Sequence, residues 1–112
     1  MKLFEWGKTY FKTATKFKEH SHLSMFISGA SVKENWDTES TGDVNFYQLK
    51  GVVNAIMEKF GMNKFNVRTE ESELSCLDYG LKYKVNNIDL VEFGKIDSAT
   101  QKQFSINNEV FY

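Results

Sequence analysis

The sequence predicts one α+β domain, in which an antiparallel sheet of about five or six strands carries one long and one short helix. Three observations predict this fold. Most apolar segments of the 112-residue chain alternate with polar residues, which is the period of a strand. The segment Val44–Gly61 instead repeats its apolar residues at intervals of three and four, which is the period of an amphipathic helix. A helix-capping pattern near the C-terminus predicts the short helix.

The long helix carries a capping pattern at each end. Asn45 followed by Gln48 fits a capping box, and Gly61 is placed for a left-handed C-terminal cap. Truncation of Phe46 or Ile56 to alanine is expected to cost about 2–5 kcal/mol. The apolar stripe predicted to face the core is Phe46, Leu49, Val53, Ile56 and Phe60.

Two strands are predicted before this helix. Residues 3–11 alternate and place three aromatic side chains on one face, which predicts the first strand. Residues 13–21 are polar and are predicted to form a turn or an extended loop, and a second strand is predicted at residues 23–29. Residues 31–42 are expected to form a polar loop that contains Trp36.

The segment after the helix predicts a short strand followed by a hairpin. Residues 65–68 fit the short strand. Residues 81–85 alternate apolar side chains with Lys82 and Lys84, which predicts a half-buried strand with these lysines toward solvent. Asn86-Asn87 accepts positive φ angles, so a tight turn is expected to lead into a strand at residues 88–96.

The C-terminal segment predicts one more helix and one more strand. Ser98 with Gln101 repeats the capping-box pattern and is expected to open a short helix that reaches about Phe104. Glu109–Tyr112 begins an extended apolar segment that stops mid-pattern. We therefore expect residues 1–112 to be a single domain taken from a longer protein.

Composition excludes several classes of protein. Fourteen basic and fifteen acidic side chains leave a net charge of -1, so no overall field recruits nucleic acid or an anionic membrane. No apolar run approaches the roughly 20 residues that span a bilayer, and the first residues lack the apolar core of a signal peptide. The lone Cys76 excludes an internal disulfide and fits a cytoplasmic protein.

The aromatic content is high, with ten Phe, five Tyr and two Trp. A small domain buries only part of such a load, so some of these side chains are expected at an interface with another chain or domain. The alternative is a Phe-rich core with tyrosines at strand ends. The candidate interface residues are Trp6, Trp36 and Tyr47.

Catalytic and metal-binding patterns are sparse. His20 and His22 are two residues apart and would share a face of a strand, where both could ligate a metal, but exposed loop histidines are the preferred interpretation. Cys76 has no flanking sequence of a catalytic nucleophile, and no glycine-rich phosphate loop is present. Lysines interleaved with aromatic residues offer a second possibility, contact with an RNA backbone. These lysines are Lys8, Lys12, Lys16 and Lys18.

Five segments carry a family resemblance when they are taken in order. They are Leu3-Phe4-Glu5-Trp6-Gly7, a strand ending at Gly29, Trp36 in the following loop, the helix kernel Phe46-Tyr47-Gln48-Leu49-Lys50-Gly51, and Phe93-Gly94-Lys95-Ile96. In this order they resemble the catalytic-like core of the bacterial phenylalanyl-tRNA synthetase beta subunit. Residues 104–112 are similar to the segment that follows in that family. One departure is Ser75–Gly80, where the family commonly has a His-Pro-Gly segment.

The resemblance implies a fold like that of class II aminoacyl-tRNA synthetases but without the active site. It implies that the alpha subunit, the partner in an (αβ)2 assembly, activates phenylalanine with ATP and magnesium. It also implies that tRNA is contacted mainly by other domains, so no cofactor is expected in this fragment.

The arginine count supports this expectation. Class II activation uses two arginines on the ATP phosphates, because planar guanidinium groups stabilise that charge. This chain has one arginine, Arg68, so it is not expected to be an enzyme on its own. The alternative that remains is a free-standing α+β domain that binds a small molecule or a peptide.

Overall fold

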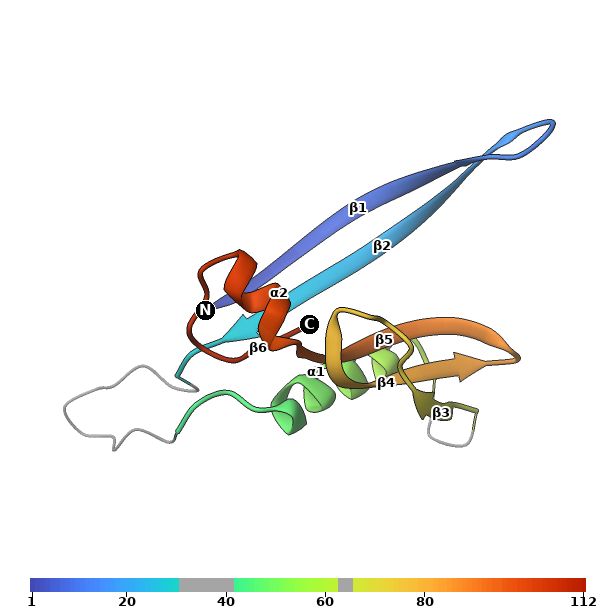
Figure 1. Ribbon diagram of the computed structural model, residues 1–112. Coiled ribbons are helices and arrows are strands. Elements are labelled where there is room, and N and C mark those ends of the chain that lie inside the picture. Colours follow the sequence, from blue (N-terminus) through green and yellow to red (C-terminus); the bar gives the residue numbers. More distant parts are fainter. Residues whose placement is uncertain (31–41, 63–65) are drawn as a thin grey trace.

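The computed structural model describes residues 1–30, 42–62 and 66–112, which form one six-stranded antiparallel sheet and two helices (Figure 1). The predicted α+β fold is therefore confirmed. The strand order is β1-β2-β6-β5-β4-β3. The strands are β1 (Lys2–Lys12), β2 (Phe17–Ser28), β3 (Arg68–Glu71), β4 (Leu77–Val85), β5 (Ile88–Ile96) and β6 (Val110–Phe111), and the helices are α1 (Phe46–Lys59) and α2 (Ser98–Gln103).

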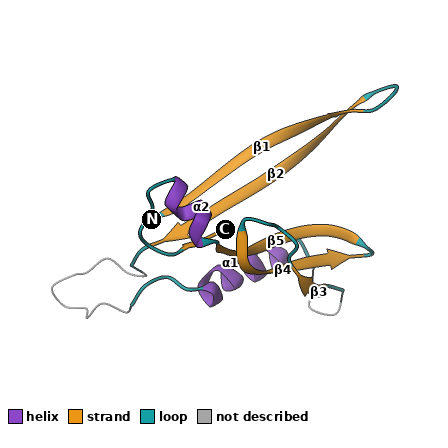
Figure 2. Cartoon of the chain, in the orientation of Figure 1, coloured by secondary structure: helices purple, strands orange, loops and turns teal. Residues whose placement is uncertain are grey.

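Strands β1 and β2 form a long two-stranded ribbon that extends away from the other elements (Figures 1 and 2). The prediction of a loop at residues 13–21 is wrong, because β2 begins at Phe17, which pairs with Lys12. The turn is short and is closed by a hydrogen bond of 2.8 Å from the Thr13 amide to the Lys16 carbonyl. The prediction failed because this segment is polar, and a strand with both faces exposed to solvent needs no alternating apolar side chains.

The C-terminal strand β6 joins the two halves of the sheet. Phe111 pairs with Ile27 of β2 on one side and with Lys95 of β5 on the other. Next to this pair, Tyr112 and Gly94 exchange two backbone hydrogen bonds of 2.8 and 2.9 Å. The predicted final strand is confirmed, and it lies in the middle of the sheet.

Helix α1 has the predicted caps. The Asn45 side chain accepts a hydrogen bond of 3.1 Å from the Gln48 amide. At the other end Gly61 has a φ of +74°, and the Met62 amide donates to the Met57 carbonyl at 3.0 Å. This pattern of a left-handed residue and a bond from the residue after it satisfies carbonyls of the last turn.

The core lies between α1 and one face of the sheet. Phe93, Phe111 and Leu49 are its most deeply buried large side chains. Because these residues come from β5, β6 and α1, the helix covers the sheet where the β1–β2 ribbon joins the β4–β5 hairpin through β6. The buried cluster consists of Ile27, Val44, Leu49, Val53, Met57, Tyr83, Phe93 and Phe111.

The predicted stripe of α1 is correct in part. Leu49 and Val53 are buried, but Phe60 is 73% exposed, and Met57 takes the buried position in the last turn. Phe60 is the C-cap residue, so it lies beyond the last helical residue that packs on the sheet. Phe46 and Ile56 are half-buried.

The remaining elements follow the prediction with small shifts. Asn86 and Asn87 have φ angles of +50° and +62°, which confirms the tight turn between β4 and β5. The strand predicted at residues 65–68 is β3, which begins at Arg68, and residues 63–65 lie outside the described residues. The N-cap of α2 is Asp97 and not Ser98. Asp97 is the N-cap because its carboxylate accepts hydrogen bonds from two free amides of the first turn, those of Ala99 and Thr100.

Candidate interaction surfaces

One face of the β1–β2 ribbon carries exposed aromatic side chains from both strands. Trp6 pairs with Leu23, and Phe4 pairs with Met25, so the side chains of each pair share a face. Phe4 is 78% exposed and Trp6 is 66% exposed. We call this surface the hairpin face, and its exposed members are Phe4, Trp6, Tyr10, Phe17 and Leu23.

The hairpin face continues into the core. Met25 and Ile27 follow Leu23 at alternate positions of β2 and therefore point to the same side of the sheet. Ile27 is 3% exposed and belongs to the core under α1, and Met25 packs against that core. The same sheet face is thus covered at one end by α1 and bare along the ribbon.

The structure separates the four lysines that were candidates for RNA contact. Lys8 and Lys12 alternate with the aromatic residues of the hairpin face, whereas Lys16 lies in the turn. Lys18 lies on the opposite face, because it pairs with Phe11. Lys8 forms an ion pair of 2.7 Å with Glu19. RNA contact stays a prediction, and the four lysines do not form one continuous basic surface.

The two histidines lie on a strand and not in a loop, which corrects that part of the interpretation. His20 and His22 point to the face opposite the hairpin face, with ring centroids 6.4 Å apart. His22 Nε2 lies 2.7 Å from Thr9 Oγ1, and the His20 ring contacts Phe11 edge-on. Among the described residues no three metal-ligating side chains gather in one place.

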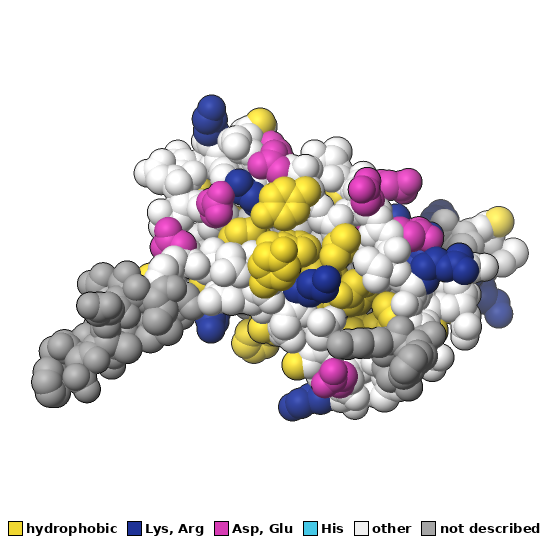
Figure 3. All heavy atoms as spheres, turned by 90° about the horizontal axis from the view of Figure 1, so that it is seen from below, with side chains coloured by type: hydrophobic (Ala, Val, Ile, Leu, Met, Phe, Trp, Pro, Cys, Tyr) yellow, Lys and Arg dark blue, Asp and Glu magenta, His cyan; other side chains and the backbone are white. Residues whose placement is uncertain are grey.

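A second aromatic surface lies at the start of α1. The ring of Phe46 contacts those of Tyr47, at 6.0 Å, and Tyr79, at 5.5 Å, and stacks on the buried Phe93 at 5.6 Å. Tyr47 is 78% exposed and Tyr79 is 51% exposed. We call Phe46, Tyr47 and Tyr79 the Tyr47 surface. Figure 3, seen from the side of α1, shows hydrophobic side chains gathered at the centre of this side of the molecule.

The candidate interface residues therefore fall on different parts of the molecule. Trp6 lies on the hairpin face and Tyr47 on the surface at the start of α1. Trp36 lies outside the described residues. Phe17 and Tyr79 were not among the predicted interface residues. Strand alternation groups Phe17 with Trp6 only once the correct turn between β1 and β2 is known.

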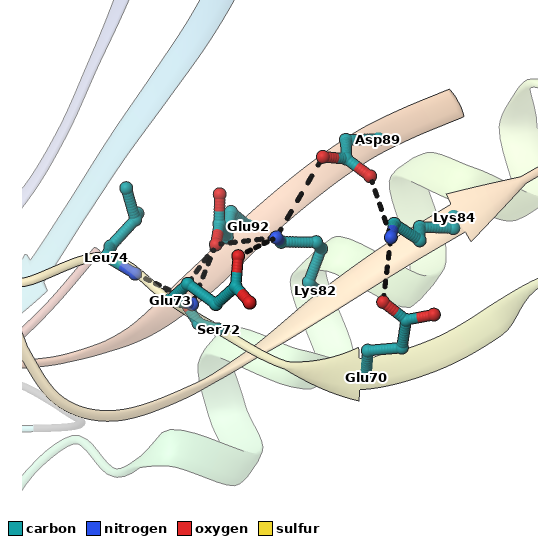
Figure 4. Close-up of polar contacts among 8 residues, drawn as sticks. All are labelled: Glu70, Ser72, Glu73, Leu74, Lys82, Lys84, Asp89 and Glu92. Carbon is teal, nitrogen blue, oxygen red and sulfur yellow. Dashed lines mark hydrogen bonds and ion pairs between the residues drawn. The ribbon is translucent and has the colours of Figure 1, made fainter. Parts of the chain in front are cut away.

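A cluster of ion pairs lies on β4, β5 and the segment before β4 (Figure 4). Lys82 is 8% exposed, which corrects the prediction that its side chain faces solvent. Its Nζ lies 3.4 Å from Glu73, 3.7 Å from Glu92 and 3.9 Å from Asp89. Burial by itself lowers the pKa of Lys82, but the charges of these carboxylates outweigh it and raise that pKa.

The ion pairs hold the chain before β4 against the sheet. Ser72 donates a hydrogen bond of 2.8 Å to Glu92, which also accepts from the Glu73 amide. Lys84 lies 2.8 Å from Glu70 and 3.5 Å from Asp89. Each lysine is matched by carboxylates, so the arrangement is that of a structural cluster.

A polar pocket of about 520 Å³ lies beside the turn between β4 and β5. It contains Arg68, the one arginine of the sequence. The charge of Lys84 is already compensated by Glu70 and Asp89, which leaves Arg68 as the cation of the pocket that has no ion pair among the described residues. The lining is Asn66, Val67, Arg68, Lys84, Asn86 and Asn87.

Comparison with known proteins assigns the chain to a family. The family model described as the phenylalanyl tRNA synthetase beta chain CLM domain matches residues 1–112. The chain belongs to the CLM domain family of the phenylalanyl-tRNA synthetase beta chain. The resemblance found in the sequence is therefore confirmed over the whole chain.

Relatives of this domain are beta subunits of phenylalanine–tRNA ligases. The chain is 27% identical to that of Bacteroides fragilis over 124 residues and 27% identical to that of Thermotoga maritima over 112 residues, with the whole chain covered in both. It is 26% identical to the chloroplastic beta subunit of Porphyra purpurea over 115 residues. The matched part is 15%, 14% and 16% of these relatives. The chain thus spans about one seventh of the length of the beta subunits it matches.

The described parts of the CLM domain hold no membrane-spanning candidate. Neither α1 nor α2 is long and apolar enough to cross a bilayer.

Proposed function

We propose that this chain is a non-catalytic supporting module of a phenylalanyl-tRNA synthetase beta subunit. In this proposal it has the class II synthetase-like fold, and it works in the cytoplasm within an (αβ)2 assembly. ATP and magnesium act in the alpha subunit, and tRNA is bound mainly by other domains. Membership of the CLM domain family supports the assignment, and the single arginine of the sequence supports the absence of phenylalanine activation by this module.

The Tyr47 surface is the proposed contact with the alpha subunit. Tyr47 and Tyr79 are exposed, yet Phe46 fixes them to the core through its stack on Phe93. Rigid aromatic side chains that are bound to a core lose little freedom on association, and aromatic residues dominate the binding energy of interfaces. This packed and exposed pair of tyrosines is the observation on which the proposed contact rests.

The test is assembly of the intact beta subunit with its alpha subunit. Replacing Tyr47 and Tyr79 by alanine is expected to weaken assembly by about 30-fold or more, as expected for hot-spot residues that contribute 2 kcal/mol. Phe60→Ala is the matched control, because Phe60 is an exposed aromatic residue at the far end of α1. Unchanged assembly of the tyrosine variant would count against this contact.

The non-catalytic role has its own test. The isolated chain is expected to give no phenylalanine-dependent exchange between ATP and pyrophosphate. Formation of aminoacyl-adenylate by the purified chain would contradict the role as a supporting module. The parent gene is expected to encode a much longer beta subunit, and a gene that ends near Tyr112 would favour the free-standing binding domain.

A further inference from the structure

We propose that the hairpin face binds an amphipathic helix that carries acidic residues beside its apolar stripe and belongs to another segment of the same beta subunit. This inference rests on the proposed function, since it requires the chain to be part of a longer polypeptide. It concerns a different surface from the proposed contact with the alpha subunit.

The hairpin face is apolar and bare where the ribbon leaves the sheet. Every residue from 8 to 23 is exposed, and Phe17 at the far end is 75% exposed. A two-stranded ribbon is at best marginally stable by itself in water, and large contiguous exposed apolar patches mark interaction sites. A partner that covers the aromatic residues would stabilise the ribbon and remove these side chains from water.

The layer that covers the same sheet face nearby is a helix. Ile27 and Met25 of β2 pack in or against the core under α1, and the next alternate residue, Leu23, is the first exposed member of the hairpin face. The hydrophobic face is thus continuous from the part that α1 covers to the part on the ribbon that lacks a covering layer. Extension of the helical layer along the ribbon would complete it.

The dimensions of the ribbon fit one helix. Each strand occupies about 4.8 Å across a sheet, so two paired strands are about 10 Å wide, close to the diameter of one α-helix. From Phe4 to Lys12 the hairpin face runs about 26 Å at roughly 3.3 Å per residue, which corresponds to a helix of about 18 residues.

Charge determines the kind of helix. Lys2, Lys8 and Lys12 alternate with the aromatic residues, so they point to the hairpin face. Lys8 is paired with Glu19, whereas Lys2 and Lys12 make no ion pair among the described residues. A helix that covers this face would leave these two ammonium groups partly desolvated, and acidic residues beside its apolar stripe would compensate them.

The same polypeptide is the favoured source of the helix. The relatives are about seven times longer than this chain, which leaves most of a beta subunit outside residues 1–112. A segment of the same chain binds at a high effective concentration. Single-stranded RNA fits less well as a partner. Binding along an RNA phosphate backbone needs a row of unpaired cations on the protein, and Lys8 of the hairpin face is already paired with Glu19.

The test is photo-crosslinking in the intact beta subunit. The photoreactive residue p-benzoylphenylalanine replaces Tyr10 on the hairpin face or, as the control, His20 on the opposite face. The beta subunit is irradiated alone, with the alpha subunit and with tRNA, and the crosslinked peptides are identified by mass spectrometry. We expect the Tyr10 probe to capture a beta-subunit peptide with apolar residues at helical spacing and neighbouring Asp or Glu, with or without the alpha subunit. The His20 probe is not expected to capture it.

Charge reversal sharpens the result. Lys12→Glu is expected to lower the crosslink yield several-fold, whereas Lys18→Glu, on the opposite face, leaves it unchanged. Capture of the alpha subunit alone, of RNA, of a second beta subunit or of nothing would overturn the inference. Size-exclusion chromatography of the same samples reports assembly with the alpha subunit, so failure of the proposed function is seen separately.

Discussion

Gly80 of β4 and Gly94 of β5 lie directly opposite each other in a place where neither backbone leaves room for a side chain. A methyl group on Gly94 would stand 2.2 Å from the Tyr79 carbonyl oxygen and 2.7 Å from the Gly80 Cα. A methyl group on Gly80 would stand 2.7 Å from the Phe93 carbonyl oxygen. The facing atoms belong to the backbone of the sheet, so they cannot rotate away.

Gly94→Ala is expected to lower the free energy of unfolding by about 3 kcal/mol, because the strands must separate or distort to admit the methyl group. Urea denaturation of the isolated domain measures this loss. Gly51→Ala is the control, since Gly51 lies inside α1 with nothing within 4 Å of the added atom. This variant is expected to gain about 0.5–1 kcal/mol from helix propensity. Equal stability of the two variants would contradict the close approach.

Leu49→Ala and Met57→Ala are each expected to cost about 2–5 kcal/mol, because both side chains are buried under the sheet. Phe60→Ala is expected to change the free energy of unfolding by about 0.5 kcal/mol or less, since Phe60 is an exposed C-cap residue. The three values come from the same denaturation experiment. A large loss of unfolding free energy in Phe60→Ala would contradict this and would place Phe60 in the buried stripe expected from sequence periodicity.

Much of the fold could be predicted from local patterns. The caps at Asn45 and Gly61 and the turn at Asn86-Asn87 depend on the intrinsic preferences of a few adjacent residues, and all three are present. The choice between Phe60 and Met57 depends instead on where α1 ends relative to the sheet. That boundary is a tertiary property, and both residues fit the helical period.

The surfaces were harder to predict than the elements. Trp6 could be named from its type, but its grouping with Phe17 requires the register of β1 and β2. A strand that is exposed on both faces has no burial pattern, so the start of β2 was not visible in residues 17–22. Burial of Lys82 was missed for a related reason, because its carboxylate partners come from segments on both sides of β4.

Acid is expected to destabilise the domain in part through the cap of α2. The Thr100 hydroxyl and the amides of Thr100 and Ala99 donate to Asp97 and lower the pKa of its carboxyl group. A carboxylate with a lowered pKa stabilises the fold above its ordinary pKa of 3.8, and this stabilisation is lost as pH falls through the lower value.

Asp97→Asn keeps a side-chain oxygen that can cap the helix but removes the titrating group. We expect the variant to lose less stability than the natural chain between pH 5 and about pH 2. Thermal unfolding followed by circular dichroism at several pH values measures the difference. Asp97→Ala is the companion variant, which is expected to be less stable than Asp97→Asn at neutral pH. Identical pH profiles of the natural chain and Asp97→Asn would remove Asp97 from the acid response.

At alkaline pH the ion cluster of β4 is expected to weaken. Burial by itself lowers the pKa of Lys82, but Glu92, Glu73 and Asp89 outweigh it, so this pKa lies above its ordinary value of 10.5. The stabilisation is therefore complete below the ordinary pKa and is lost as pH rises through the raised value in the folded protein. Lys84 and Lys95 also have raised pKa values, held up first of all by hydrogen bonds to Glu70 and Glu109.

Lys82→Met tests this assignment. The variant is expected to be less stable than the natural chain at pH 8, because three carboxylates lose their shared cation. Its stability is also expected to fall less between pH 10 and about pH 12, because one titrating ammonium group is gone. Lys16→Met, in the exposed turn of the ribbon, is the control and should keep the natural pH profile. If Lys82→Met keeps the pH profile of the natural chain, the loss of stability at alkaline pH arises from other groups.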